Sequence, residues 1–353
     1  MNAQAEYETP DRLYCAQPPQ PQPVLRSDLG HDRAAAILQN RTKWANGTVL
    51  HYAFLDEGGD VGGPEQLEEV RHAFGKWKGL GIGLEFTEVT SPDESEIRIA
   101  FSTSEGSKST VGRDALTVGT DEPTTHYGWK LNSPYGRATA LHELGHVIGF
   151  AHEHQNPDAG IVWDDEAVYD DLAGPPNRWP RDVTYHNILR KLSRSEVRGS
   201  PWDPGSVMEY PFGPGLIVKP EQYGRDGIPD PLDLSAVDKD RVQRWYPALA
   251  ARPARLEPYR SQALRLSSGE QVDFEIVPTE TRRYEIGTFG DADFLLVLFE
   301  ERDGELRYAG GDDDSGEERN GRLRMRLVKG RRYVARARLY STWNSGGAAL
   351  MYW

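Results

Sequence analysis

Hydrophobic and polar residues alternate in two different periods over the first third of the chain. In the stretch 64–77 the apolar residues are spaced three or four apart and a proline stands at the start, which predicts an amphipathic helix. The stretches 49–55, 84–89 and 96–101 instead alternate apolar with polar residues, as half-buried strands do. Strand, helix, strand, strand is the opening of a mixed α+β unit.

Helical spacing returns around Ala138–Ala151 and, more loosely, at 166–171, 181–190 and 236–245. A short helical pattern also covers Asp32–Gln39. It follows a stretch rich in proline and glutamine at 16–24, which we interpret as an extended connector.

The composition changes near Pro247–Pro258, and beyond it short alternating runs are separated by glycine-containing turns. Evenly spaced runs of this kind predict a small all-β sandwich. The predicted organisation is therefore an N-terminal extension over 1–43, possibly a prosegment, a main domain over 44–248, a linker over 249–257 and the sandwich over 258–353.

The net charge of −14 at pH 7 argues against a nucleic-acid partner, because phosphate binding needs basic clusters. No apolar run is long enough to cross a membrane, and we expect a monomer. The first 25 residues lack the basic start and the apolar stretch of a secretory signal. The sequence leaves open whether a signal was removed, the protein is exported another way, or it stays inside the cell.

Residues 142–152, HELGHVIGFAH, carry the clearest chemistry. His142 and His146 are four residues apart, so on a helix both imidazoles project from one face and can bind one ion. Glu143 lies beside the first ligand and can take a proton from a metal-activated water. Gly149 can adopt the left-handed conformation that ends a helix, which would turn His152 back to the same ion.

Three neutral nitrogens leave one coordination position open to water, and that is typical of catalytic rather than structural zinc. Three histidines at this spacing by coincidence would be rare, because the pattern fixes five positions. The remaining histidines are not predicted ligands; His126 is assigned to substrate, and His154 to solvent or backbone.

A second motif, Gly205-Ser206-Val207-Met208-Glu209-Tyr210, resembles the methionine-containing turn beneath the metal in metzincins. With the zinc motif, the segment THYGW and the closing LSAVDKDRVQRWYP, it makes roughly Trp44–Pro247 similar to the astacin-type metzincins, in particular bacterial and fungal ones. The region from about Tyr259 more loosely resembles the pre-peptidase C-terminal domains of secreted bacterial proteases. The fold class so implied is a metzincin domain, with a twisted mixed sheet plus helices, followed by the sandwich.

The resemblance implies a zinc endopeptidase acting on proteins or peptides, with zinc on His142, His146 and His152 and Glu143 as general base. Tyr210 would be a switchable zinc ligand that stabilises the oxyanion, Met208 an apolar floor beneath the metal, and Glu153 a structural partner. Residues 124–129 resemble the edge strand that pairs with substrate, which would make Thr125, His126, Tyr127, Gly128 and Trp129 substrate-binding. An extracellular location is implied as well.

Three departures separate this chain from animal astacins. Glu209 stands where they carry histidine, and HQNPDAG after the third ligand lacks further residues that they conserve there. Their catalytic-domain disulfides are absent as well, since Cys15 is the one cysteine. Substrate preference therefore cannot be carried over. Cys15 itself has two interpretations, a thiol that packs against the body or a latency ligand that caps the zinc.

Three alternatives stay open at this point. Asp291, Asp293 and 312–314 could bind calcium, although acidic runs are usually solvated turns. The chain could be a catalytically silent zinc-binding module that attaches to a surface, although Glu143 would then have no purpose. It could also be a zinc amidase acting on non-peptide substrates, which the SVMEY turn disfavours.

Overall fold

The computed structural model describes residues 13–17, 41–55, 62–103, 106–194, 201–249, 253–267, 270–313, 315–316, 320–340 and 345–353. The helix predicted at Asp32–Gln39 and most of the proline-rich connector lie outside these residues. The chain divides into two compact units, one comprising 1–43, 52–74 and 89–238 and the other 44–51, 75–88 and 239–353. The domain limits expected from composition stay a prediction.

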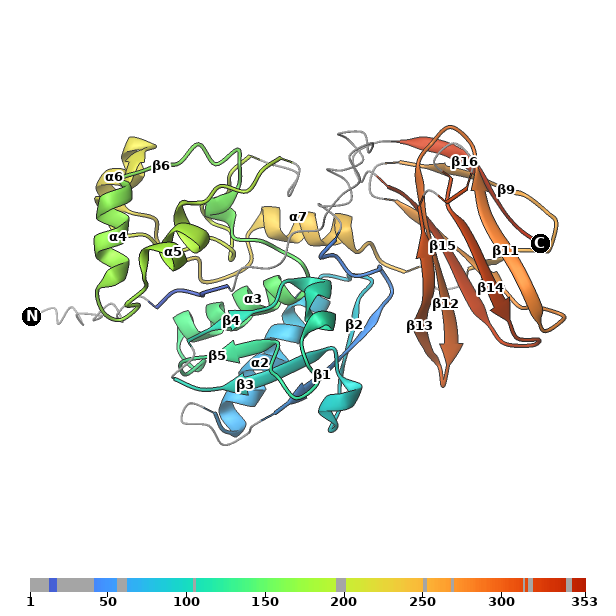
Figure 1. Ribbon diagram of the computed structural model, residues 1–353, viewed down its shortest axis with the longest axis horizontal. Coiled ribbons are helices and arrows are strands. Elements are labelled where there is room, and N and C mark those ends of the chain that lie inside the picture. The colour runs from blue at the N-terminus through green and yellow to red at the C-terminus, as the bar shows by residue number, and fades with distance from the viewer. Residues whose placement is uncertain are drawn as a thin grey trace, which may run out of the picture. The chain divides into compact units, whose positions relative to one another are not determined.

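A five-stranded mixed sheet forms the base of the first half of the chain (Figure 1). Its spatial order is β2-β1-β3-β5-β4, with β3 parallel to both β1 and β5 and β4 antiparallel to β5. The strands are β1 (Val49–Phe54), β2 (Glu85–Glu88), β3 (Ile97–Phe101), β4 (Lys108–Ser109) and β5 (Thr125–Tyr127). The three strands expected from alternation are confirmed.

Helix α2 (Pro64–Lys78) follows the first strand, as the apolar spacing predicted. Proline at the first helical position, an acidic first turn and lysines in the last turn favour a helix with these limits. The ring of Phe74 on this helix stacks on Tyr52 of β1, with 4.2 Å between ring centroids. The apolar face of α2 is thus buried against the sheet.

Helix α3 (Pro134–Val147) carries the zinc motif, but its limits differ from the predicted 138–151. It begins four residues earlier because Ser133 caps it, accepting a hydrogen bond from the Gly136 N–H at 2.9 Å, and Pro134 fits the first turn. It ends earlier because Gly149 has φ +103°, a left-handed conformation that terminates helices. Figure 1 shows α3 lying over the sheet beside β4.

The region after the zinc motif contains mainly short elements. Of the predicted helices, α4 (Asp165–Ala173) is longer than expected, α7 (Ala236–Trp245) matches, and 181–190 splits into α5 (Arg181–Thr184) and a π turn over Tyr185–Leu189. Helix α6 (Glu221–Asp226) and the antiparallel pair β6 (Val162–Trp163) and β7 (Ile217–Lys219) were not predicted. Short 3-10 turns are found at Pro92–Glu94, Gly112–Thr117 and Glu153–Gln155.

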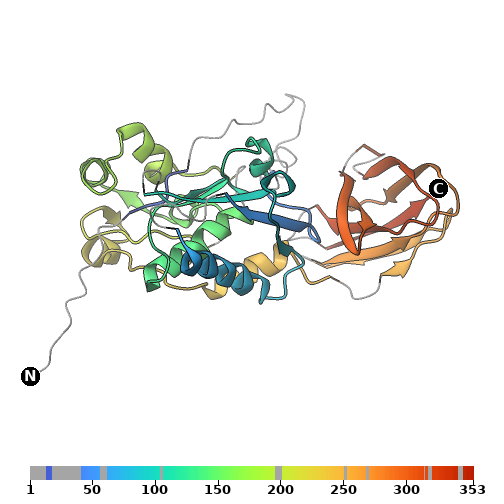
Figure 2. The same ribbon diagram turned by 90° about the horizontal axis from the view of Figure 1, so that it is seen from below.

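The last part of the chain forms two sheets, which confirms the expected all-β architecture (Figure 2). One sheet has the order β13-β12-β15-β10-β8 and the other β14-β11-β16-β9, and every pair is antiparallel except β8 with β10. A single apolar cluster draws side chains from both sheets, among them Phe294, Leu298 and Leu350. The strands are β8 (Ala254–Arg255), β9 (Gln262–Leu266), β10 (Gln271–Ile276), β11 (Arg282–Phe289), β12 (Phe294–Arg302), β13 (Glu305–Asp312), β14 (Arg322–Leu327), β15 (Tyr333–Leu339) and β16 (Gly346–Tyr352).

Among the helices described, none is long and apolar enough to cross a membrane.

Candidate metal centre and active site

The three histidines of the motif converge. His142 and His146 lie one turn apart on α3, and after the left-handed Gly149 the chain reverses so that His152 joins them. The Nε2 atom of His146 lies 3.1 Å from the Nε2 atoms of both His142 and His152. The geometry expected from the spacing of the motif is therefore present.

The other ring nitrogens fix which atom faces the centre. Nδ1 of His142 lies 2.7 Å from the Val207 carbonyl oxygen, and Nδ1 of His146 lies 2.8 Å from that of Phe150. A carbonyl oxygen can only accept, so each Nδ1 carries the hydrogen and each Nε2 presents a lone pair. Lone pairs that face one another without a hydrogen between them require a cation.

The donor set fits zinc. Two nitrogens bound tetrahedrally at about 2.1 Å lie roughly 3.4 Å apart, close to the spacing found here. All three rings are buried, and burial lowers the pKa of His142 to about 4 and those of His146 and His152 well below the usual value. The imidazoles are therefore neutral, which is the form that binds a metal.

Cys15 joins this cluster from a distant part of the sequence. Its Sγ atom and one ring nitrogen of each histidine all lie within 4.8 Å of one another, and among the described residues this is the group of potential ligands that could hold a metal ion. The carboxylates proposed to bind calcium form no such group where they are described. Asp312 Oδ2 instead accepts the backbone N–H groups of Ser315 and Arg322.

Glu143 lies beside the cluster with its side chain fully buried. Its Oε2 accepts a hydrogen bond from the Cys15 thiol at 3.8 Å. Burial raises the pKa of Glu143 to about 8, against a smaller lowering by hydrogen bonds from Ser109 and Cys15. A divalent cation on the histidines would lower this pKa again by its charge, so Glu143 can alternate between proton acceptor and proton donor near neutral pH.

The turn 205–210 is held from outside the motif by Asp238, at the start of α7. Asp238 accepts hydrogen bonds from the Ser206 hydroxyl at 2.6 Å and the Val207 N–H at 2.9 Å. The Val207 carbonyl in turn orients His142. Met208 is fully buried, and its carbonyl accepts the Glu153 N–H at 2.9 Å, so the turn is tied to the end of the zinc motif. The role of Met208 as a floor beneath the metal stays a prediction.

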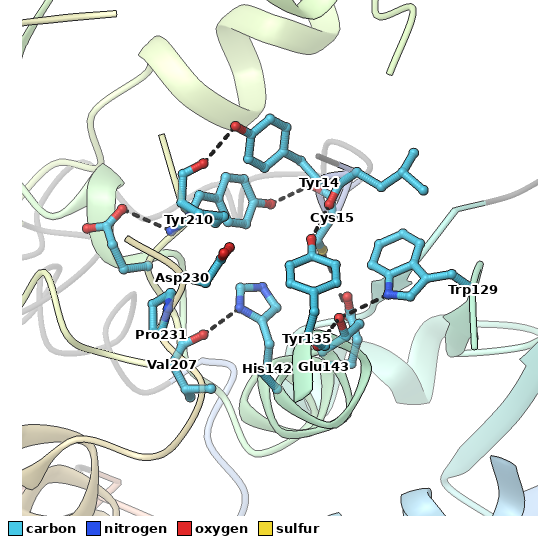
Figure 3. Close-up of a pocket in the computed structure, with 15 residues that line it drawn as sticks. Tyr14, Cys15, Trp129, Tyr135, His142, Glu143, Val207, Tyr210, Asp230 and Pro231 are labelled. Atoms are coloured by element: carbon cyan, nitrogen blue, oxygen red, sulfur yellow. Dashed lines mark hydrogen bonds between the residues drawn. The ribbon is translucent and has the colours of Figure 1, made fainter. Parts of the chain in front are cut away.

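Tyr210 reaches the centre from the end of that turn. Its hydroxyl lies 2.7 Å from His152 Nε2 and donates to the Cys15 carbonyl oxygen at 2.5 Å (Figure 3). Burial raises the pKa of Tyr210 well above its usual value, so the group is a neutral hydrogen-bond donor. This places the hydroxyl where it can reach either a ligand of the metal or a peptide carbonyl.

Two buried glutamates lie close by with separate partners. Glu153 Oε1 accepts from the Asn156 side chain and the Asp203 N–H, at 3.0 and 3.1 Å. Glu209 Oε2 accepts from the Trp202 indole at 2.6 Å, and its Oε1 accepts the Tyr210 N–H at 3.0 Å. Burial raises the pKa of Glu209 well above its usual value. Glu209 is buried, and both of its carboxylate oxygens accept hydrogen bonds within the protein.

The predicted substrate strand needs correction. Residues 125–127 form β5, which lies between β3 and β4 and is not an edge strand; the edge is β4 (Lys108–Ser109). Thr125 and Tyr127 are fully buried, and the backbone of β5 pairs with a strand on each side. Of the five residues assigned to substrate, Trp129 lines the cleft, where it stacks on Tyr135. We missed Tyr135 in the sequence, as nothing near it resembles a motif.

Tyr14 and Cys15 line the cleft together with Leu13, and the segment 13–17 is held beside it by hydrogen bonds (Figure 3). Tyr135 donates to the Leu13 carbonyl at 2.6 Å, the Tyr14 N–H donates to Asn177 Oδ1 at 3.1 Å, and the Gln17 N–H donates to Asn187 Oδ1 at 2.9 Å. The cleft is lined by Leu13, Tyr14, Cys15, Trp129, Tyr135, Ala138, Thr139, His142, Glu143, Val207, Glu209, Tyr210, Pro211, Asp230 and Pro231.

Known proteins are similar to this chain in sequence and in fold. The sequence profile of the matrixin family matches residues 43–159. Zinc metalloproteinase nas-22 of Caenorhabditis elegans is 27% identical over 173 residues, which are 49% of this chain and 41% of that protein. Myroilysin superposes with a TM-score of 0.53 at 30% identity, covering 60% of this chain and 98% of its own. The chain belongs to the metzincin zinc metallopeptidases, as a member of the astacin type.

The chain spans 41% of the length of the curated relative that it matches. Its C-terminal part is similar to the pre-peptidase C-terminal domain of Bacillus anthracis collagenase at 14% identity and a TM-score of 0.26, covering 30% of this chain and 98% of that domain. Values this low carry no argument, so that resemblance stays a prediction.

Proposed function

We propose that the protein is a zinc-dependent endopeptidase. The observation that carries the proposal is the meeting of three histidine Nε2 atoms with a buried carboxylate, Glu143, at a cleft that residues 13–15 help to line. His142, His146 and His152 would hold the zinc. When bound there, zinc supplies a Lewis acid and lowers the pKa of a nearby water.

Glu143 acts on the attacking water and on the leaving amine. The oxygen that accepts from the Cys15 thiol, Oε2, faces the centre and can take a proton from water in its place. Burial favours the neutral form of this carboxyl, so once Glu143 holds the proton it can pass it to the departing nitrogen. One carboxylate thus serves as base and then as acid.

Tyr210 stabilises the oxygen that becomes negative. Its hydroxyl already donates to the carbonyl oxygen of Cys15, which is a peptide carbonyl at the reacting centre. A substrate carbonyl in that position would receive the same hydrogen bond, which strengthens as charge develops. We therefore assign Tyr210 to oxyanion stabilisation.

The metal requirement is tested with an unfolded protein such as reduced casein. The Cys15→Ser chain is expected to cleave it, to lose all cleavage after treatment with a chelator, and to regain it when zinc is added back. Peptide products are followed by mass spectrometry. Undiminished cleavage by protein shown to be free of metal would refute the proposal, and a zinc-loaded chain that cleaves nothing would favour a silent binding module.

Tyr210→Phe is expected to lower kcat by about 10²- to 10³-fold with little change in KM, because the lost hydrogen bond forms mainly in the transition state. The phenyl ring preserves the stacking with Tyr14, so the fold is kept. Steady-state kinetics on one peptide measure both constants. A rise in KM at unchanged kcat would instead indicate a role in substrate binding.

We further propose that Cys15 keeps the full chain latent. Its side chain is 4% exposed, its Sγ lies with the three histidine nitrogens, and its thiol occupies the side of Glu143 that would face water. Without a metal, burial and Glu143 raise the pKa of this thiol, whereas a divalent cation favours the thiolate. The segment 13–17 would then occupy both the open metal position and the cleft.

Cys15→Ser is the test of latency. The variant is expected to cleave casein at least tenfold faster than the unprocessed wild type at equal zinc content, since serine is a poorer zinc ligand than cysteine. Equal rates before any processing would show that Cys15 only packs against the body. An extracellular location and a monomeric state stay predictions.

A further inference from the structure

The side chain of Tyr14 is enclosed by three other aromatic rings. It is 5% exposed and stacks on Tyr210 and Phe212, at 5.0 and 5.8 Å between ring centroids with interplanar angles of 28° and 26°. Trp179 packs against it in a tilted arrangement at 6.3 Å. Offset aromatic pairs at these distances favour a flat ring over an aliphatic chain of equal area.

A polar group lies at the end of this pocket. The Tyr14 hydroxyl donates to the Pro211 carbonyl oxygen at 2.8 Å, in a buried position. Proline has no N–H, but its carbonyl still needs a donor when water is excluded. The pocket therefore suits a phenol: its aromatic walls contact the ring, and the Pro211 carbonyl oxygen accepts a hydrogen bond from the hydroxyl.

The pocket is one residue away from the reacting centre. Cys15, the next residue, places its Sγ beside Glu143 and its carbonyl oxygen on Tyr210. The backbone before Cys15 is also fixed, because the Tyr135 hydroxyl donates to the Leu13 carbonyl and the Tyr14 N–H donates to Asn177. When the carbonyl of position 15 is the one that receives the Tyr210 hydrogen bond, the bond that follows it is the scissile one, so the pocket holds the side chain of the second residue before the cut.

We propose that the pocket formed by Trp179, Tyr210, Pro211 and Phe212 is a specificity subsite, and that it selects substrates with tyrosine as the second residue before the scissile bond. The inference rests on the proposed endopeptidase function. Phenylalanine would fill the walls but leave the Pro211 carbonyl without a donor. Aliphatic residues would lose the ring stacking as well.

The same segment explains why Tyr14 precedes Cys15. In the latent chain Tyr14 occupies the subsite while Cys15 occupies the metal position, so the segment is bound as a substrate is bound but presents a thiol to the metal. The competing interpretation is that Tyr14 is only a core residue covering Phe212. The two interpretations differ in what they predict for substrates that lack this segment.

The first experiment needs no catalysis. In the full zinc-loaded chain, the rate at which Cys15 reacts with a disulfide reagent reports how firmly the segment is held. We expect Tyr14→Phe to react a few-fold faster than wild type, Tyr14→Leu at least tenfold faster and Tyr14→Ala faster still. Leu13→Ala is the matched control and should change the rate little. Equal protection by leucine and tyrosine would overturn the proposal, since any apolar side chain would then suffice.

The second experiment measures cleavage by the zinc-loaded Cys15→Ser chain. Products of unfolded proteins should be enriched in tyrosine at the second residue before the cut. In matched peptides, tyrosine there should raise kcat/KM at least tenfold over alanine and a few-fold over phenylalanine. Trp179→Ala, which enlarges the pocket, should reduce the preference for tyrosine over alanine while the enzyme still cleaves.

The outcomes separate the two proposals. Chelator-sensitive cleavage without aromatic enrichment would overturn the subsite and leave the endopeptidase function standing. A tyrosine preference that Trp179→Ala does not alter would place the selecting pocket elsewhere. A zinc-loaded chain that cleaves no substrate would overturn both.

Discussion

Glu143→Gln is expected to lower kcat/KM for peptide cleavage by about 10²- to 10⁴-fold while zinc content stays at one ion per chain. Glutamine has nearly the same shape, so the buried site keeps its packing. It cannot take a proton from water, however, and it cannot pass one to the leaving nitrogen. Both proton transfers assigned to this carboxylate are lost together. The variant is best made in the Cys15→Ser chain, so that latency does not mask the effect.

Glu153→Gln is the matched control for that experiment. Glu153 is also a buried glutamate near the motif, but its carboxylate accepts from the Asn156 side chain and the Asp203 N–H and not from the Cys15 thiol. Its replacement is expected to lower the midpoint temperature of unfolding clearly and to lower kcat only slightly. A Glu143→Gln enzyme that retains its activity would rule out the assigned general base, whatever the control shows.

His146→Ala is expected to abolish zinc binding at micromolar zinc and, with it, all detectable cleavage. The Nε2 atom of His146 is the central one, 3.1 Å from the Nε2 atoms of both His142 and His152. Without it, only these two histidine nitrogens remain to bind zinc. Zinc at a thousand times its dissociation constant stabilises a fold by about 4 kcal/mol, and this increment should disappear from the variant. Thermal unfolding with and without zinc measures it.

His72→Ala is the control for nonspecific effects of removing an imidazole. His72 lies on α2 with a side chain that is 71% exposed, and it pairs only weakly with Glu68 one turn earlier. Its zinc content, activity and zinc-dependent stabilisation should equal those of the parent. Zinc retained by His146→Ala at parental affinity would show that the ion is held by other residues.

The sequence predicted the parts of the site that depend on local geometry. The period of a helix brings His142 and His146 to one face, and a left-handed glycine at 149 returns the chain to His152. These relations lie within residues 142–152, so local geometry is enough to predict them. The alternation of the early strands and the spacing of α2 were readable for the same reason.

What the sequence did not predict depends on contacts between distant segments. The hydrogen bond from the Cys15 thiol to Glu143 joins residues 128 positions apart, and the hydrogen bond from Tyr14 to Pro211 joins residues 197 positions apart. β5 was mistaken for an edge because only the tertiary fold reveals that two residues of β4 pair with it. One local feature of the sequence pointed to Asp238, since Ser235 and Asp238 exchange hydrogen bonds in the manner of a capping box. Its hydrogen bonds with Ser206 and Val207 could not be predicted from the sequence.

The hydrogen bonds from the turn 205–210 to Asp238 connect the start of α7 to the zinc motif. Asp238 fixes the Val207 N–H, and the Val207 carbonyl fixes the ring of His142. A nascent chain that has emerged only as far as residue 230 already contains every predicted zinc ligand, yet it lacks the carboxylate that steadies the support of the first one. The chain thus supplies all its zinc ligands well before it supplies the residue that supports the orientation of His142. The metal centre is complete only once α7 has been added.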